Sequence, residues 1–335
     1  MQYKTKYRAA RRKRRMEEAV VVCGAMRASA GGLHVCGDKI QIREMLSADL
    51  APAAIRKKIL GAGTVILAGV PQVLRDDLIQ FCFERDIRCY VEQTVCDVML
   101  RSARNVQLRD TSLLLLPNAG LTSRQRLGKR AFDIVGALAG ICLASPLMAL
   151  IALCIKLDDG GPVLFTQNRL TEGGKVFRIY KFRSMQPADG QQGYVLTRKN
   201  DSRLTAVGRV IRRLHLDELP QLVNILRGEM SFVGPRPECP ELAAEYRKVI
   251  PQFDYRLKAR AGLTGFAQVY GKYNSAPADK LKLDLHYIAN YSFFLDMKLI
   301  FRTFRILFHR EKSEGIDPWQ TSAAPGRDGD GYGAV

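Results

Sequence analysis

The sequence lacks any metal-binding or disulfide pattern, although it holds eight cysteines. No two of them form a C-x-x-C pair, and none clusters with histidine, so neither a zinc site nor a disulfide framework is predicted. We therefore expect reduced thiols on the cytosolic side. A G-x-G-x-x-G fingerprint is also missing, because Gly24, Gly31 and Gly32 are too loosely spaced to form one.

Acidic residues are few relative to basic ones. The 335 residues include 33 Asp and Glu against 52 Lys and Arg, which gives a net charge of +19. Such an excess predicts an anionic partner: nucleic acid, acidic phospholipid or a phosphorylated substrate. Composition alone does not choose between these, and the length allows two domains with their own cores.

The N-terminus is strongly basic between residues 4 and 15. We interpret residues 1–19 as a solvated tail that touches anionic lipid, with a nucleic-acid arm or a disordered tail without function as alternatives. The apolar run at residues 19–26 is short for a signal peptide and is flanked by charges, so a signal peptide is the less favoured interpretation.

Apolar runs alternate with amphipathic segments between residues 20 and 120. The runs are VVVCGA, TVILAGV, IRCYV and SLLLLP. This alternation predicts a small parallel α/β layer, that is, a Rossmann-like domain. Because the glycine fingerprint is absent, a structural or regulatory role is preferred over nucleotide binding.

The most apolar segment covers residues 132–157. As one helix it would be about 39 Å long, more than the roughly 30 Å of a bilayer core. Ser145 and Pro146 lie in its middle, where proline removes a helical hydrogen bond, and basic residues flank both ends. We therefore predict a re-entrant helical hairpin in one leaflet, with a kinked single span and a buried soluble helix pair as alternatives.

Two further segments predict a β-hairpin and an amphipathic helix after the apolar segment. PVLFTQ and VFRIYKFRSM, joined at Gly173 and Gly174, predict a β-hairpin that carries Lys181 and Arg183, which as an alternative are ordinary solvated cations. LKLDLHYIANYSFFLDMKLIFRTFRILFHR suits a helix at a membrane interface, although an ordinary core helix fits equally well. Residues 313–335 form a polar tail that we expect to be disordered.

The stretch RRLHLDELPQLVNILRGEMSFVGPRP, residues 212–237, combines acids, bases, proline and glycine. Asp217 and Glu218 are adjacent, Pro220 suits the first turn of a helix, and Gly228 suits its end. Both acids are therefore expected at or just before a helix N-terminus.

Arginines flank the acid pair, with Arg212 and Arg213 before it and Arg236 after it. Carboxylates beside guanidinium groups and free backbone N–H groups suit phosphate chemistry. A structural ion-pair cluster is the alternative from the residues alone.

The order of these motifs resembles a known family. The matching pieces are KRAFDIVGA, the Ser145–Pro146 break, GPVLFTQNR, FRIYKFRSM, DSRLTAVGRVIRR, LDELPQLVNILRGEMSFVGPRPE, GLTGFAQVYG and DLHYIANYSFFLDMKLI. They resemble the bacterial polyprenyl-phosphate phosphosugar transferases, or monotopic phosphoglycosyl transferases, over residues 124–307. The resemblance implies an α+β membrane-associated catalytic domain at residues 121–312, with the re-entrant hairpin and interfacial amphipathic helices.

The family transfers a sugar 1-phosphate from a nucleotide sugar, commonly a UDP-sugar, to undecaprenyl phosphate and thereby starts exopolysaccharide, capsule or glycan assembly. By resemblance, Asp217 is the nucleophile that forms an acyl-phosphate, and Glu218 binds Mg²⁺. The resemblance and the forked, bidentate geometry of the guanidinium group favour Arg212 and Arg236 as phosphate ligands. Lys181 and Arg183 are weaker candidates for the same role. The expected partners are both substrates and membrane lipids at the cytoplasmic face of the bacterial inner membrane, without nucleic acid. A homo-oligomer is left open.

The sequence departs from the family pattern at three positions. His215 stands where Ser or Thr usually caps the helix, and Ala261 and Ser202 stand where proline is common. We expect these substitutions to loosen the backbone locally and to leave both acids of the pair in place. Larger members carry transmembrane helices ahead of a Rossmann-like domain, and this chain is expected to lack those helices. A non-catalytic scaffold on the same fold is the main alternative function, and nucleic-acid binding ranks last.

Overall fold

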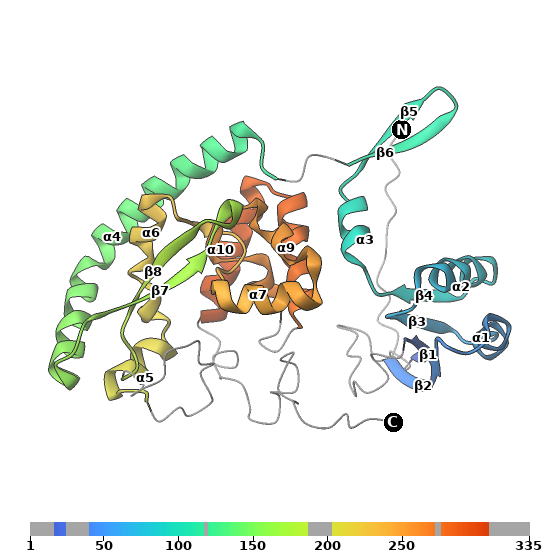
Figure 1. The fold of residues 1–335 in the computed structure, drawn as a ribbon, viewed down its shortest axis with the longest axis horizontal. Coiled ribbons are helices and arrows are strands. Elements are labelled where there is room, and N and C mark those ends of the chain that lie inside the picture. Colours follow the sequence, from blue (N-terminus) through green and yellow to red (C-terminus); the bar gives the residue numbers. More distant parts are fainter. Residues whose placement is uncertain (1–16, 25–39, 117–119, 187–202, 272–275, 308–335) are drawn as a thin grey trace, which may run out of the picture. The chain divides into compact units, whose positions relative to one another are not determined.

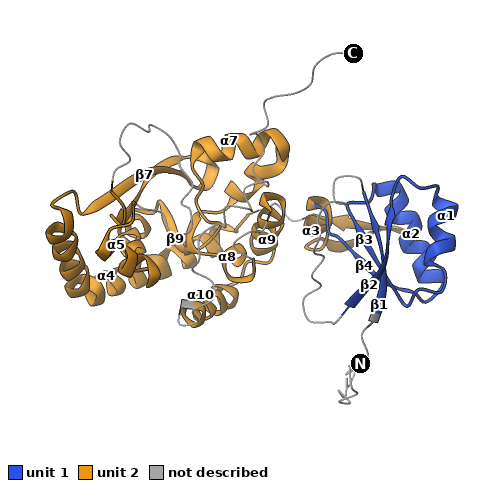
Figure 2. Ribbon diagram, turned by 90° about the horizontal axis from the view of Figure 1, so that it is seen from below, with its two compact units in different colours: residues 1–94 blue, residues 95–335 orange. Residues whose placement is uncertain are grey.

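The computed structural model describes residues 17–24, 40–116, 120–186, 203–271 and 276–307. The chain forms two compact units, residues 1–94 and residues 95–335 (Figure 2). Most of the predicted basic tail and all of the predicted C-terminal tail lie outside the described residues.

The first unit is built on a four-stranded parallel sheet with the strand order β2-β1-β3-β4 (Figure 1). Its elements are β1 (Glu17–Cys23), β2 (Ile40–Ser47), α1 (Pro52–Ile59), β3 (Thr64–Ala68), α2 (Gln72–Glu84) and β4 (Arg88–Val91). The central strands β1 and β3 are buried, as expected where both faces of a parallel sheet are covered. Three of the four predicted runs therefore contribute strands to the parallel layer, and residues 19–23 of the run that resembles a short signal core belong to strand β1.

One sequence expectation for this region is wrong, and one strand was missed. The fourth strand of the sheet is β2, which the sequence did not reveal because an edge strand tolerates the charged residues in IQIREMLS. SLLLLP instead forms most of β6 (Thr111–Leu115), which pairs antiparallel with β5 (Arg104–Leu108) in the second unit. The second unit begins at Val95, and its first helix, α3 (Val95–Leu100), packs against α9 (Pro277–Ala289). The domain boundary at residue 120 stays a prediction.

The second unit is a mixture of helices and small sheets. Its other elements are α4 (Ser123–Asp159), β7 (Leu164–Leu170), β8 (Val176–Phe182), α5 (Ala206–Arg213), α6 (Gln221–Arg227), β9 (Met230–Val233), α7 (Pro240–Val249), β10 (Ala261–Thr264), α8 (Phe266–Tyr270) and α10 (Phe293–Leu307), with 3₁₀ turns at Glu172–Gly174, Leu216–Glu218 and Pro251–Lys258. The predicted β-hairpin is confirmed: β7 and β8 are antiparallel, and Gly173 and Gly174 turn the chain with φ of 71° and 75°.

Helix α4 continues through Pro146 as one helix, where two separate arms were expected. Proline cannot donate to the carbonyl of Cys142, but the Ser145 hydroxyl donates to that same oxygen at 2.9 Å. The neighbouring side chain thus replaces the missing bond and the helix bends without ending (Figure 1). Within the described residues, α4 is the one helix whose length and composition would allow it to cross a membrane, and little of it is buried.

The N-terminal half of α4 is anchored to the rest of the second unit. The Lys129 ammonium forms a buried ion pair with Asp296 of α10 at 2.6 Å. The Arg130 guanidinium donates to the carbonyls of Ile225 and Leu226, both at 2.6 Å, and so satisfies the C-terminal end of α6. Gly140 faces the side chain of Leu222, which lets α4 and α6 approach closely. Helix α4, which carries the apolar segment, is therefore fixed to α6, which follows the acid pair.

The long amphipathic segment near the C-terminus forms two helices of different character. Helix α9 is largely a core helix, with Leu281, Leu285 and Ile288 buried. Helix α10 exposes aromatic side chains, among them Phe294 at 83% and Phe301 at 81% exposure. The core-helix interpretation thus applies to α9, and a membrane-interface role for α10 stays a prediction.

Candidate active site

The adjacent carboxylates of Asp217 and Glu218 lie in the 3₁₀ turn between α5 and α6. Pro220 is the residue directly before α6, and the helix ends at Gly228, whose φ of 82° is in the left-handed region. The prediction that both acids lie just before a helix N-terminus is confirmed. The local reason is that Pro220 has a helical φ already fixed and has no N–H to leave unpaired.

His215 is held by the backbone, and its imidazole makes no capping bond. The residue adopts a left-handed conformation with φ of 55°, which histidine tolerates better than bulky or β-branched residues do. Its N–H donates to the carbonyl of Arg212 at 3.1 Å, and its own carbonyl accepts from the N–H of Glu218 at 3.3 Å. These two bonds define the turn that presents the acids, so the usual hydroxyl cap is replaced by main-chain contacts.

The β7–β8 hairpin supplies the first cation of the site. The buried Asn224 side chain of α6 accepts from the N–H of Tyr180 at 3.0 Å and donates to the carbonyl of Arg178 at 2.7 Å. These bonds fix β8 against α6 in one register. Lys181, the next residue of the strand, thereby reaches Glu218 with its ammonium 2.7 Å from Oε1.

Glu218 contacts two cations through the same oxygen. Besides Lys181, a guanidinium nitrogen of Arg236 lies 3.4 Å from Oε1. Burial acts to raise the pKa of Glu218, but the charges of Lys181 and Arg236 outweigh it and lower the pKa to about 2. Glu218 is therefore ionised at neutral and mildly acidic pH.

Asp217 has the opposite character. Its exposure is only 8%, and burial raises its pKa above the ordinary value, although the charge of Lys181 partly opposes this. The nearby negative charge of Glu218 raises the pKa of Asp217 as well, whereas Arg212 lowers it. The pKa values of the two adjacent acids thus shift in opposite directions, which makes Asp217 the more basic carboxylate and keeps Glu218 ionised at neutral pH.

The remaining predicted cations differ in position. Arg212 is close enough to Asp217 to influence its pKa, and its guanidinium contacts the sulfur of Met185 at 3.4 Å. Arg183 is buried and pairs with Asp159 at the end of α4. The structure therefore brings Lys181 and Arg236 to the acid pair, with Arg212 near Asp217, while Arg183 ties the hairpin to α4. Ser145 and Pro146 lie in the middle of α4, where they shape the helix.

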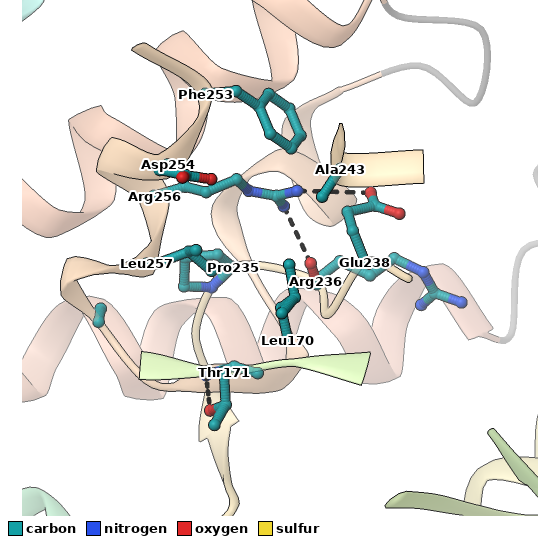
Figure 3. A pocket seen from close by; sticks show the side chains of 12 residues that line it. Leu170, Thr171, Pro235, Arg236, Glu238, Ala243, Phe253, Asp254, Arg256 and Leu257 are labelled. Carbon is teal, nitrogen blue, oxygen red and sulfur yellow. Dashed lines mark hydrogen bonds and ion pairs between the residues drawn. The ribbon is translucent and has the colours of Figure 1, made fainter. Parts of the chain in front are cut away.

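Sequence reasoning missed a second buried charge cluster that adjoins Arg236. Arg256, which is 4% exposed, pairs with Asp284 at 2.7 Å and with Glu238 at 3.4 Å, and it donates to the backbone carbonyl of Arg236 at 2.9 Å (Figure 3). No local pattern marks these residues, since Arg256 and Asp284 lie on different elements. The cavity beside them measures about 10 Å³ and holds at most about one water, so it is no substrate pocket.

The described residues contain no group of three or more His, Cys, Asp or Glu side chains that would hold a metal ion unaided. Mg²⁺ does not need one, because it commonly takes one or two protein carboxylates and completes its shell with phosphate oxygens and water. Among the described residues, both cation contacts of Glu218 use Oε1, so Oε2 is the oxygen left for a metal. The donor chemistry of the acid pair fits Mg²⁺.

A basic carboxylate, an ionised neighbour and several cations form a site suited to an anionic, phosphorylated substrate. A carboxylate of this kind is a competent nucleophile toward phosphorus. Cations placed around it stabilise the charge that builds up on phosphate oxygens during transfer.

Comparison with known proteins agrees with this chemistry. The family model described as "Bacterial sugar transferase" matches residues 124–310, which include every residue of the site. A UDP-N-acetylgalactosamine-undecaprenyl-phosphate N-acetylgalactosaminephosphotransferase of Aeromonas hydrophila is 45% identical over 183 residues, covering 53% of this chain and 43% of that protein.

Two further relatives differ in how much of their length is matched. The exopolysaccharide production protein PSS of Rhizobium leguminosarum bv. phaseoli is 41% identical, over 52% of this chain and 92% of that protein. A UDP-glucose:undecaprenyl-phosphate glucose-1-phosphate transferase of Escherichia coli (strain K12) is 35% identical, over 67% of this chain and 52% of that protein. The match thus spans about half the length of the relatives from Aeromonas hydrophila and Escherichia coli. On the family match and the site within it, the chain belongs to the bacterial sugar transferase family.

Proposed function

We propose that the protein transfers a sugar 1-phosphate from a nucleotide sugar, most simply a UDP-sugar, to undecaprenyl phosphate, and so starts the assembly of an exopolysaccharide, capsule or glycan. The observation that carries the proposal is the acid pair with its cations: Asp217 buried and more basic, Glu218 ionised between Lys181 and Arg236. The names of the related proteins support the two substrate classes.

The transfer proceeds in two steps at Asp217. In the first, a carboxylate oxygen of Asp217 attacks the phosphorus that bears the sugar, a P–O bond forms, and the P–O bond to the nucleoside monophosphate breaks. In the second, an oxygen of undecaprenyl phosphate attacks the same phosphorus, which frees the Asp217 carboxylate and leaves a lipid-linked diphosphate sugar. Two bulky substrates can use one site in turn because the reaction is divided in this way.

The surrounding residues bind and orient the phosphates. Arg236 and Arg212 offer forked donors to phosphate oxygens, and Lys181 contributes a point charge while also keeping Glu218 ionised. Mg²⁺, when held by Glu218, would neutralise charge on the donor phosphates. The low pKa of Glu218 keeps a carboxylate ready for the metal across the physiological range.

The protein is membrane-associated in this proposal, through α4 and α10. The exposed leucines of α4 and the exposed phenylalanines of α10 have no covering partner among the described residues, and a bilayer would cover them. We infer that α4 enters and leaves the same leaflet, with the site on the cytoplasmic face of the inner membrane. The parallel sheet of residues 17–94 is compatible with a Rossmann-like accessory domain.

The test is release of nucleoside monophosphate. Protein with UDP-sugars, Mg²⁺ and undecaprenyl phosphate should release UMP, and Asp217→Asn should abolish release because an amide is a poor nucleophile. Undiminished release in Asp217→Asn would remove Asp217 as the nucleophile. Vesicle binding by the wild type without turnover of any nucleotide sugar would favour the non-catalytic scaffold.

A further inference from the structure

The loop GPRPE, residues 234–238, carries Arg236 and is held at every carbonyl from Pro235 to Glu238. Two of these carbonyls accept backbone N–H groups: Pro235 accepts from Gly262 and Glu238 accepts from Leu170, both at 2.9 Å. The other two accept from arginine side chains: Arg236 from Arg256 at 2.9 Å and Pro237 from Arg169 at 3.1 Å. Because Pro235 and Pro237 also fix φ on either side of Arg236, the backbone of this loop is constrained by both covalent geometry and hydrogen bonds.

The buried carboxylate of Asp284 holds Arg256 in the position from which it reaches the Arg236 carbonyl. Asp284, 1% exposed, contacts Arg256 through one oxygen: Oδ2 accepts from Nε at 2.9 Å and lies 2.7 Å from Nη2. Nη2 is also the nitrogen that donates to the Arg236 carbonyl. Asp284 on α9 therefore fixes the direction in which Arg256 points at the loop.

The side chain of Arg236 leaves the loop in the other direction. Figure 3 shows the Arg236 guanidinium pointing away from Arg256, while the carbonyl of the same residue faces it. The guanidinium meets Glu218 at 3.4 Å. Arg236 thus connects two parts of the site. Its backbone carbonyl bonds to Arg256 in the buried cluster, and its side chain contacts Glu218 of the acid pair.

We propose that Arg256, oriented by Asp284, is a positioning residue for Arg236. By fixing the Arg236 carbonyl, it aims the Arg236 guanidinium at Glu218 and at the donor phosphate. Arg256 itself touches no reacting atom, and its effect on the reaction passes through Arg236. The kinetic part of this inference rests on the proposed function, whereas the geometric part does not.

The experiment is a double-mutant cycle between Arg236 and the Arg256–Asp284 pair. The pair is removed as a unit, Arg256→Met with Asp284→Leu, because deleting one partner would leave a buried charge alone. In the wild-type background, we expect kcat/KM for the UDP-sugar to fall roughly a hundredfold. In an Arg236→Ala background, the same pair removal should cause no further fall. An equal fall in both backgrounds would show a general structural role and overturn the proposal.

Two further variants serve as a substitute for the pair deletion and as a control. Arg256→Lys keeps the charge and should keep the fold, but lysine lacks the Nε donor to Asp284 and the Nη1 contact with Glu238, so the donor to the Arg236 carbonyl is no longer held in one direction and the loss of activity should persist. If the pair-deleted protein does not fold, Arg256→Lys replaces it in the cycle. Arg247→Gln removes an exposed arginine that pairs with Asp254, and it should leave the activity unchanged.

A readout independent of turnover separates this inference from the proposed function. Hydrogen exchange at the amides of Gly262 and Leu170, which bond the loop carbonyls, should accelerate in the Arg256 variants and not in Arg247→Gln. If the wild type turns over no nucleotide sugar, the proposed function fails and hydrogen exchange alone decides the positioning role. Unchanged protection of both amides would contradict it.

Discussion

Two neighbouring carboxylates can differ in chemistry because their surroundings differ. Glu218 meets Lys181 and Arg236 directly, and these charges outweigh the cost of its burial. Asp217, one residue earlier, is dominated by burial, so its carboxylate is the more basic of the two. A shift of one pKa unit corresponds to about 1.4 kcal/mol, so differences of this kind are large enough to assign separate roles.

Lys181 should control the acid limb of the reaction. Its charge lowers the pKa of Asp217, so Lys181→Met should raise that pKa further and move the acid limb of kcat/KM for the donor to higher pH. Glu218, with a pKa of about 2, does not produce this limb in the wild type. Arg178→Met, an exposed cation on the same strand, should leave the limb in place. If the acid limb of Lys181→Met lies at the same pH as in the wild type, or at a lower pH, Lys181 does not control this limb.

At this scale, local patterns in the sequence predicted only part of the site. Asp217, Glu218 and the helix that follows them could be predicted because proline, glycine and adjacent charges act within a few residues. The pairing of Arg183 with Asp159 and that of Arg256 with Asp284 depend on how distant elements pack. Charge and spacing alone give arginine no preferred partner, and so these contacts appear only in the structure.

Among the elements, α4 shows how a serine can offset a proline. The sequence predicted a break at residues 145–146, but the Ser145 hydroxyl occupies the carbonyl that Pro146 leaves unpaired, and the helix continues. The β7–β8 hairpin was predictable from its glycines, whereas β2 was not, because an edge strand needs little apolar alternation.

The serine and the proline should be energetically coupled. Ser145→Ala leaves the Cys142 carbonyl unpaired in an apolar helix and should cost about 1–3 kcal/mol of stability. In a Pro146→Ala background, the restored N–H serves that carbonyl, so Ser145→Ala should cost little. Thermal unfolding of the four proteins in the same detergent measures the coupling. Equal losses in both backgrounds would show that the hydroxyl does not replace the missing bond.

For the molecule as a whole, the surfaces proposed to contact the membrane and the acid pair lie in the same unit. Helix α4 is tied to α6 through Arg130 and to α10 through Lys129, so the surfaces proposed to meet lipid are linked directly to the helix after the acid pair. A lipid phosphate arriving from the bilayer surface would then reach Asp217 without leaving the interface.

The re-entrant topology proposed for α4 can be tested at the two ends of the helix. Thiol labels introduced at Arg124 and at Asp158, near the two ends of the helix, should react from the same side of inverted membrane vesicles. Residues 124 and 158 are both exposed, so neither label needs the fold to open. Reactivity from opposite sides would replace the re-entrant helix by a true span.

The covalent step at Asp217 is the central claim, and a single-turnover measurement tests it most directly. Protein mixed with the UDP-sugar and Mg²⁺ in the absence of undecaprenyl phosphate should release UMP in a rapid burst that approaches one equivalent per enzyme. The burst should be missing in Asp217→Asn. UMP release from the wild type only after undecaprenyl phosphate is added would contradict the claim and indicate direct transfer between the two substrates.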